Sequence, residues 1–218
     1  MDGKTDFLAL LSSSSPFCED LSPPPLTIFT KEAITRSTDI LIQCIRTSDV
    51  SFLYSLLFFP PLSPSSSSTL YPMSVPPLVN APDVNGWSLI HYCASVENLS
   101  IDILDALYCA GAEISLFTIK EEYTILHVLA RSVKADSFVS DSSRSLQDFA
   151  FHLIEHLRAP LAAQDKTDET CIHQAAEHGE SLELLKLFLA FDSNGTIREM
   201  KNSRGYVFVI LLHDGRTD

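Results

Sequence analysis

The same local pattern occurs three times in this chain, in the segments Asp83-Val-Asn-Gly-Trp-Ser-Leu-Ile-His91-Tyr-Cys-Ala94, Tyr123-Thr-Ile-Leu-His127-Val-Leu-Ala130 and Asp165-Lys-Thr-Asp-Glu-Thr-Cys-Ile-His173-Gln-Ala-Ala176. Each segment places Ser or Thr three residues before a His and an apolar residue directly before that His. The pairs are Ser88 with His91, Thr124 with His127, and Thr170 with His173. Self-similarity of this kind indicates an array of repeated units, because one short unit cannot bury its apolar face alone.

The pattern resembles the signature T-P-L-H-x-A of the ankyrin-repeat family, which recurs about every 33 residues. The resemblance covers about residues 83–205 and, more weakly, 31–59. It implies an all-α solenoid of about three and a half helix-turn-helix repeats. His127 follows His91 by 36 residues, whereas His173 follows His127 by 46. The longer spacing predicts an insertion in the second repeat.

We expect residues 1–30 to form a disordered lead, because serines and prolines there break any hydrophobic periodicity. Residues 31–59 predict a degenerate N-terminal capping pair of helices, and residues 60–82 a Ser/Pro-rich loop. The repeats themselves are expected at 83–118, at 119–164 with the insertion 134–145, at 165–201 and, as a partial unit, from 202. The tail 206–218 departs from the pattern, so a truncated fragment without independent function is one alternative for this chain.

Local signals predict the helices inside the repeats. Ser88 is expected to N-cap one helix, and a second helix is expected at 101–110 with Gly111 at its end. In the second repeat, the polar insertion should delay the second helix to about 146–157. The third repeat predicts helices at 170–178 and 182–190.

The recurring residues have a structural interpretation. The Ser or Thr hydroxyl satisfies unpaired backbone donors at the start of the helix. In the ankyrin family, the motif His forms hydrogen bonds within and between neighbouring turns, and the resemblance implies this role for His91, His127 and His173. Departures from the family pattern are Leu89, Ile125 and Cys171 in place of Pro, Ile119 and Glu122 in place of the loop Asp and Gly, and Asp168 in place of Gly. They predict a lower stability than that of an idealised array.

The charge balance bears on possible partners. There are 28 acidic residues against 15 basic ones, and the formal net charge is −13. We expect no nucleic-acid partner, because such proteins usually present a clustered basic face. The apolar run 51–62 is ended by prolines and is too short to span a bilayer, and the run 7–11 is too short for a signal-peptide core. We therefore expect no membrane association.

The five cysteines, Cys18, Cys44, Cys93, Cys109 and Cys171, are odd in number and form no C-x-x-C pair. This spacing does not suit a disulfide framework. Cys93 and Cys171 also fall where the repeat pattern needs a small buried residue, so we expect reduced core thiols. Reduced thiols favour a cytoplasmic location, with the nucleus as an alternative.

One chemical motif competes with the repeat interpretation. His152-Leu-Ile-Glu155-His156 is an H-x-x-E-H string, as in inverted zinc metalloproteases, where the two histidines hold zinc and the Glu acts as base. A zinc-dependent hydrolase is therefore the enzymatic alternative. No third ligand stands out downstream, and the string also fits the polar side of a repeat helix. We thus expect no catalytic residue, no metal site and no cofactor.

The resemblance to ankyrin repeats implies one recognition face, made of the finger loops and the inner helices. The loop residue directly after the family Gly, here called position five, is Trp87, Tyr123, Glu169 and Tyr206 in successive units. Aromatic residues are enriched at binding hot spots. Residues at or near the inner helices that could flank them are Tyr92, Arg131, Gln174, Glu177 and His178. The alternative is that Trp87 and Tyr123 pack against adjacent loops.

The expected function is therefore non-catalytic protein–protein interaction. The chain would act as a scaffold or adaptor, or as the regulatory part of a larger signalling protein. Repeats of this family bind many unrelated partners, so the sequence predicts a protein partner without naming it.

Overall fold

The computed structural model describes residues 31–58, 79–132, 140–178 and 182–207. Within these ranges the chain is mostly helical and forms no strand, only isolated bridges between Gln164 and Thr170 and between Lys201 and Val207. The expected all-α class is confirmed. The expected disordered lead 1–30, most of the expected loop 60–82, the first part of the insertion 134–145 and most of the tail 206–218 lie outside the described residues.

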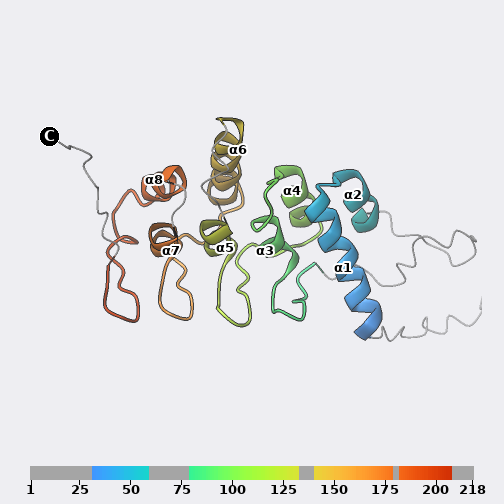
Figure 1. Ribbon diagram of the computed structural model, residues 1–218, viewed down its shortest axis with the longest axis horizontal. Helices are drawn as coiled ribbons and strands as arrows, with labels where there is room; N and C mark the ends of the chain where they lie inside the picture. The colour runs from blue at the N-terminus through green and yellow to red at the C-terminus, as the bar shows by residue number, and fades with distance from the viewer. Residues whose placement is uncertain (1–30, 59–78, 133–139, 179–181, 208–218) are drawn as a thin grey trace, which may run out of the picture.

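The helices follow one another in short pairs along the described chain (Figure 1). They are α1 (Lys31–Thr47), α2 (Val50–Phe58), α3 (Leu89–Cys93), α4 (Ile101–Cys109), α5 (Ile125–Ser132), α6 (Ser140–Phe151), α7 (Cys171–Glu177) and α8 (Leu182–Phe191). A π-helical turn, His152–His156, continues α6.

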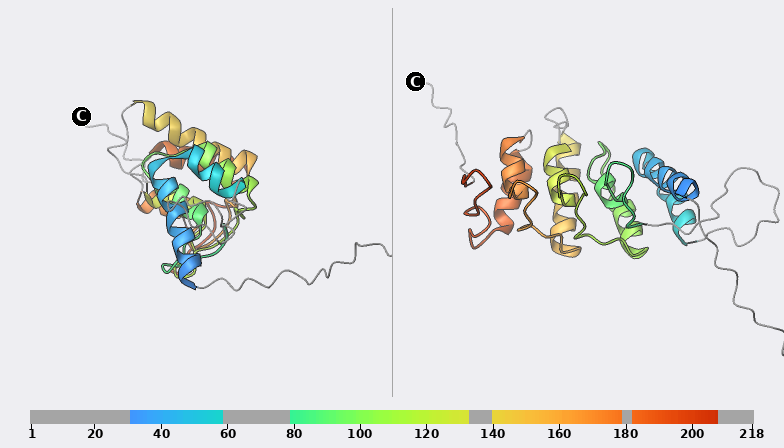
Figure 2. Two further views of the ribbon diagram at one scale, coloured as in Figure 1. Left: turned by 90° about the vertical axis from the view of Figure 1, so that its right-hand side faces the viewer. Right: turned by 90° about the horizontal axis from the view of Figure 1, so that it is seen from below.

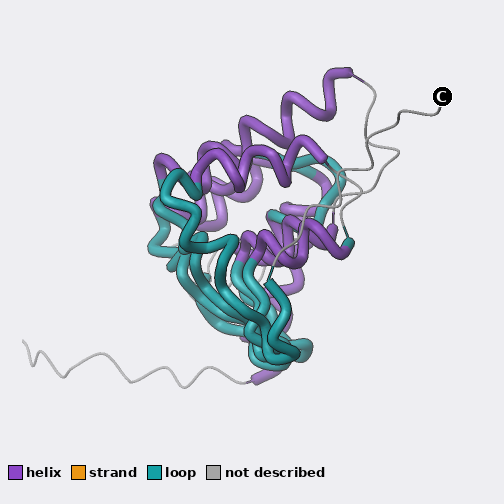
Figure 3. The backbone as a smooth tube through the Cα atoms, turned by 90° about the vertical axis from the view of Figure 1, so that its left-hand side faces the viewer, coloured by secondary structure: helices purple, strands orange, loops and turns teal. Residues whose placement is uncertain are grey.

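The helices form two rows with a layer of loops on one side. In the inner row, α1 packs on α3, α3 on α5, and α5 on α7; in the outer row, α2 packs on α4, and α6 on α8. Figure 2 shows the rows from the end and from below, and Figure 3, viewed along the rows, shows the loops gathered together beside the inner row. Every loop of this layer therefore lies next to the loop of the following unit.

Short polar residues set the helix ends. Ser100 accepts a hydrogen bond from the backbone N–H of Ile103 at 3.3 Å and so caps α4. Asp49 accepts one from Phe52 N at 3.0 Å at the start of α2. Gly111, with φ of 94°, ends α4 in the left-handed region where a side chain would be strained.

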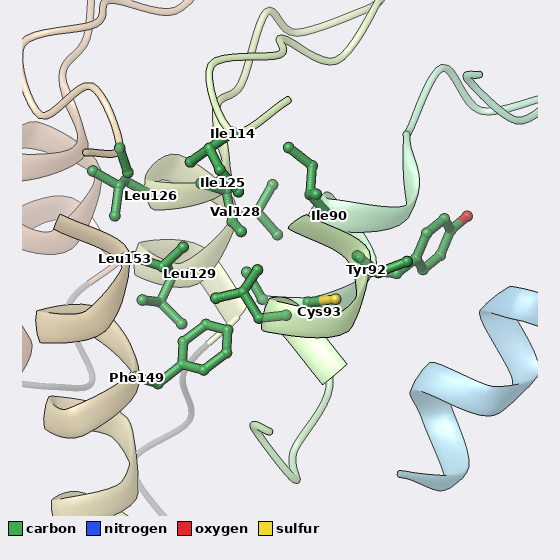
Figure 4. Packing of buried hydrophobic residues seen from close by; sticks show 14 of the residues in the cluster. Ile90, Tyr92, Cys93, Ile114, Ile125, Leu126, Val128, Leu129, Phe149 and Leu153 are labelled. Atoms are coloured by element: carbon green, nitrogen blue, oxygen red, sulfur yellow. The ribbon is translucent and has the colours of Figure 1, made fainter. Parts of the chain in front are cut away.

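A continuous apolar core lies between the two rows (Figure 4). Leu104, Leu126, Leu129, Phe149 and Phe188 are fully buried there. Burial of each such side chain stabilises the fold by roughly 1.5–3 kcal/mol. Because the buried side chains of all units form one cluster, the units depend on their neighbours for a complete core.

The structure differs from expectation at two unit boundaries. Helix α6 begins at Ser140, whereas a polar insertion was expected to continue to residue 145. A polar stretch can extend a helix when its later turns are held by packing, here of Leu146 and Phe149. The first repeat also begins before Asp83, because Val79 is buried and Asn80 is hydrogen-bonded to the end of the same repeat. Asn80 Nδ2 donates to Gly111 O, and Asn80 Oδ1 accepts from Glu113 N.

Candidate functional site

The loops that begin at 83, 118, 165 and 202 are closed by the same kind of backbone hydrogen bond, although the loop at 118 is one residue longer. In each, the N–H of the first residue donates to the carbonyl of position five, at 2.8 or 2.9 Å. The residue before position five has a positive φ in all of them; these residues are Gly86, Glu122, Asp168 and Gly205. The positive φ before position five is therefore adopted by glycine in two loops and by acidic residues in the other two.

The first residue of each loop also holds the turn through its side chain. Asp83 Oδ1 accepts from Trp87 N at 2.9 Å, and Asp165 Oδ1 accepts from Glu169 N at 3.0 Å. In the second unit, Thr118 Oγ1 accepts from Tyr123 N at 3.0 Å. The sequence pattern placed Ile119 at this position, which is wrong, because the second loop is one residue longer and Thr118 replaces the Asp.

Successive loops are joined to one another by backbone hydrogen bonds. Ile119 N donates to Gly86 O at 3.0 Å, Lys166 N to Glu121 O at 3.1 Å, and Ser203 N to Thr167 O at 2.9 Å. These bonds fix the spacing of the loop layer. The residues at position five consequently lie in register along the array.

The motif histidines connect each unit to the next. The N–H of Ser88 donates to His91 Nδ1 at 3.2 Å, which places the ring proton on Nε2. His91 Nε2 then lies 3.1 Å from the carbonyl oxygen of Tyr123. His127 repeats this arrangement, since its Nε2 lies 2.9 Å from the carbonyl oxygen of Glu169. The histidine of one unit thus donates a hydrogen bond to the backbone carbonyl of the residue at position five of the following unit.

Burial keeps these bridging histidines neutral. It lowers the pKa of His91 and of His127 from the ordinary value of 6.5, because the charged imidazolium would lose its hydration; the hydrogen bonds to backbone carbonyls act in the opposite direction. His173 makes the same hydrogen bond within its own unit, since Thr170 N donates to its Nδ1 at 3.2 Å. Its buried Nε2 has no hydrogen-bond partner among the described residues.

Two of the three aromatic residues at position five, Trp87 and Tyr123, lie half-buried against their own inner helices, whereas the third, Tyr206, is exposed. The ring centre of Trp87 lies 5.5 Å from that of Tyr92. The ring of Tyr123 stacks on that of His127, with the ring centres 5.9 Å apart. Burial raises the pKa of Tyr123, while nearby Arg131 lowers it. Each of the rings of Trp87 and Tyr123 therefore has one face packed and leaves part of its surface open to solvent.

Three of the other candidate binding residues are inside the protein. Tyr92 is 9% exposed, Glu169 8% and Gln174 2%, so the expectation that they lie on an open surface is wrong. Tyr92 donates its hydroxyl to Asp83 Oδ2 at 2.6 Å. Glu169 is buried because its carboxylate accepts from Gln174 Nε2 at 2.7 Å and from Asn202 Nδ2 at 3.2 Å. These three side chains therefore lie beneath the surface and do not form it.

The exposed candidates gather around Arg131 at the end of α5. Its Nη1 lies 2.8 Å from Gln174 Oε1 and 2.6 Å from His178 Nε2, and its guanidinium carbon lies 5.3 Å from the centre of the Tyr123 ring. Arg131, Glu177 and His178 are exposed. The contacts with Gln174, His178 and Tyr123 hold the guanidinium in one orientation over the inner row.

A second arginine–tyrosine pair was missed by the sequence reasoning. The guanidinium carbon of Arg46 lies 5.7 Å from the centre of the Tyr92 ring. Arg46 belongs to α1, outside the recognisable repeats, and only the packing of α1 on α3 brings the two residues together. No local pattern in the sequence signals this contact.

The H-x-x-E-H string lies at the outer row, in the π-helical turn. His152 Nε2 is 2.6 Å from Asp105 Oδ1 on α4, and its ring lies 5.1 Å from that of His156. Glu155 Oε2 lies 3.8 Å from Arg158 Nη1. In the described ranges, no three His, Cys, Asp or Glu side chains are grouped so that they could hold a metal ion.

The described cysteines are free thiols. Cys44, Cys93 and Cys171 are buried, as expected for core thiols, whereas Cys109 is exposed at the end of α4. Burial raises the pKa of Cys44 to about 11 and that of Cys93 to about 12, so neither is a reactive thiolate near neutral pH. Cys18 lies outside the described residues.

The rows of helix pairs and the joined loop layer together define an all-α protein built from stacked, mutually dependent units. Neither a scan against protein-family models nor a search of the curated proteins finds a match for the chain. No helix in the described ranges combines the length and apolarity that crossing a bilayer requires.

Proposed function

We propose that this chain is an ankyrin-like solenoid that binds a protein partner without catalysis. The observation that carries the proposal is the surface formed by Trp87, Tyr123 and Arg131 over the inner row. Half-exposed aromatic rings and a held arginine are the residue types that dominate binding energy at protein interfaces. Ring contacts with Tyr92 and His127 hold Trp87 and Tyr123, and hydrogen bonds to Gln174 and His178 hold Arg131, which reduces the entropy lost on binding.

The joined loops support the same proposal. Hydrogen bonds between successive loops and the bridges from His91 and His127 make the loop layer one connected surface. A partner that contacts several units at once would therefore meet side chains with fixed spacing. A scaffold, an adaptor or a regulatory part of a larger signalling protein would use such a surface. The free buried thiols favour a reducing compartment such as the cytoplasm or the nucleus.

The experiment is an affinity capture that compares wild type with Trp87→Ala and Tyr123→Ala. The matched control is Tyr108→Ala, which removes an exposed aromatic ring from α4 in the outer row. We expect a specifically captured protein to be lost with the first two variants and retained with the control. If none of the three variants changes what is captured, the aromatic residues at position five serve only packing, and the proposal is wrong.

Circular dichroism and size-exclusion chromatography of each variant separate binding from folding. The alternative that the chain is a fragment without independent function predicts an aggregated or weakly helical product even for wild type. A monodisperse, helical wild type that captures a partner through Tyr123 would exclude this alternative.

A further inference from the structure

We propose that Arg131 receives an acidic group, a carboxylate or a phosphate, from a peptide segment that lies across the inner row. This inference rests on the proposed function, since it names the chemistry of the partner at the same surface. It is carried by the way in which the guanidinium is held and by the donors that remain available on it.

The hydrogen bonds of Arg131 use only one of its nitrogens. Both hydrogen bonds, to Gln174 Oε1 at 2.8 Å and to His178 Nε2 at 2.6 Å, are made by Nη1, which has two hydrogens. Nε and Nη2 donate to none of the described residues. The donors that remain form the edge of the guanidinium that binds carboxylate or phosphate oxygens in pairs.

Buried acidic groups hold this arrangement in place. Gln174 Nε2 donates to Asp165 Oδ2 at 2.9 Å and to Glu169 Oε2 at 2.7 Å, so Gln174 Oε1 must point toward Arg131. The carboxylates of Asp165 and Glu169 thereby accept hydrogen bonds from Gln174 inside the protein. The Tyr123 ring lies against the guanidinium, and the Arg131 residue as a whole is exposed. The guanidinium is preorganised to receive an anion from solvent.

The Arg131 guanidinium is a local positive charge among acidic neighbours, of which Asp165 and Glu169 are occupied by Gln174. Among the described residues, Arg131 has no carboxylate within ion-pair distance, and its guanidinium is held by Gln174, His178 and Tyr123. Glu177 is exposed nearby on α7 but forms no ion pair with it. In a chain with a formal net charge of −13, a held guanidinium without a carboxylate partner offers a local positive charge to an acidic group of a peptide.

The test begins with a random peptide library displayed on phage and selected on the immobilised full chain. We expect the selected peptides to be enriched in Asp and Glu. Affinities of one selected synthetic peptide are then measured for wild type, Arg131→Gln and Arg131→Lys, with Lys186→Gln as the control that removes a cation from the outer row. Arg131→Gln should weaken binding about tenfold or more, Arg131→Lys should weaken it less, and the control should not change it.

The peptide is varied in the same way. Replacing its acidic residue by the amide should weaken binding to wild type and should have little further effect on Arg131→Gln, which shows that the two groups interact. A phosphoserine version distinguishes the two sources of the anion: tighter binding than the carboxylate peptide assigns phosphate, and weaker binding assigns carboxylate. Thermal unfolding of each variant checks that the fold is retained.

The possible outcomes separate this inference from the proposed function. If selected peptides lose affinity with Tyr123→Ala but bind Arg131→Gln as tightly as wild type, the acidic site is refuted and the binding surface stands. If the selected peptides lack acidic residues, the inference is likewise refuted. If no selected peptide depends on Tyr123 or Arg131, both the inference and the proposed function fail.

Discussion

Replacing Glu122 with glycine should stabilise this protein, although it removes a side chain. Glu122 has φ of 59°, a left-handed conformation that side chains rarely adopt. It is exposed, and its side chain forms no hydrogen bond or ion pair with a described residue. The equivalent residues of the first and last loops, Gly86 and Gly205, are already glycine. The backbone therefore adopts a turn for which the glutamate is poorly suited.

The magnitude follows from two opposing terms. The left-handed conformation costs a residue with a side chain roughly 1–2 kcal/mol. Glycine loses more conformational freedom on folding, which costs about 0.5–1 kcal/mol. The net gain in the free energy of unfolding is thus about 0–1.5 kcal/mol with a central value of ~0.75 kcal/mol, and the central value corresponds to a rise in Tm of about 1.5–3 °C for a chain of this size.

The assay is thermal unfolding followed by far-ultraviolet circular dichroism. Its matched control is Glu121→Gly, which makes the same change at the preceding residue, where φ is not positive. The control should lower Tm, because glycine there brings only the entropic cost. Asp168→Gly should also raise Tm, but by less, since Asp tolerates this conformation better than Glu. If Glu122→Gly lowers Tm as much as Glu121→Gly does, the reasoning from backbone strain is refuted.

Three further predictions concern the loop layer and its histidine bridges. Gly86→Ala should lower the free energy of unfolding by about 2 kcal/mol or more, because φ is 87° and an added Cβ would lie 2.8 Å from Ile119 Cβ; an unchanged denaturant midpoint would contradict this. His127→Leu should destabilise more than His173→Leu, since only His127 Nε2 has a carbonyl partner, and equal losses in chemical denaturation would count against the bridge. The stability that His91 and His127 contribute should be complete above pH 6.5 and should fall as the pH drops below it, because their pKa is lowered in the folded state and the unfolded chain therefore binds protons first. His127→Leu should flatten this pH dependence of the free energy of unfolding. A slope as steep as that of wild type would refute the assignment to His127.

Much of the local structure could be predicted from the sequence. The helix at Leu89–Cys93 was expected from Ser88 at its N-terminus, and the helix at Leu182–Phe191 from its apolar spacing, because both signals act within a few residues. The start of α6 and the identity of Thr118 at the second loop were not predicted. Both depend on how neighbouring units pack and on a one-residue difference in loop length, which the repeat spacing does not reveal.

The candidate site was predicted less well than the helices. The register directed attention to Trp87, Tyr123 and Arg131, which are partly or fully exposed, and also to Glu169 and Gln174, which are buried. A repeat position tells which residues are neighbours, not which of them faces solvent. Arg46 was missed because its partner Tyr92 lies on a helix that is distant in sequence.

By itself, the sequence determined the all-α class and the positions of the recurring His residues and of the residues at position five, because capping residues, apolar spacing and the recurring His act over short distances. Only the tertiary structure decided which of the marked side chains support the surface and which form it. Burial of Gln174 and Glu169 depends on hydrogen bonds between units, and these bonds in turn hold Arg131 on Tyr123. Exposure is a property of the packed units together, and for that reason the local sequence could not specify it.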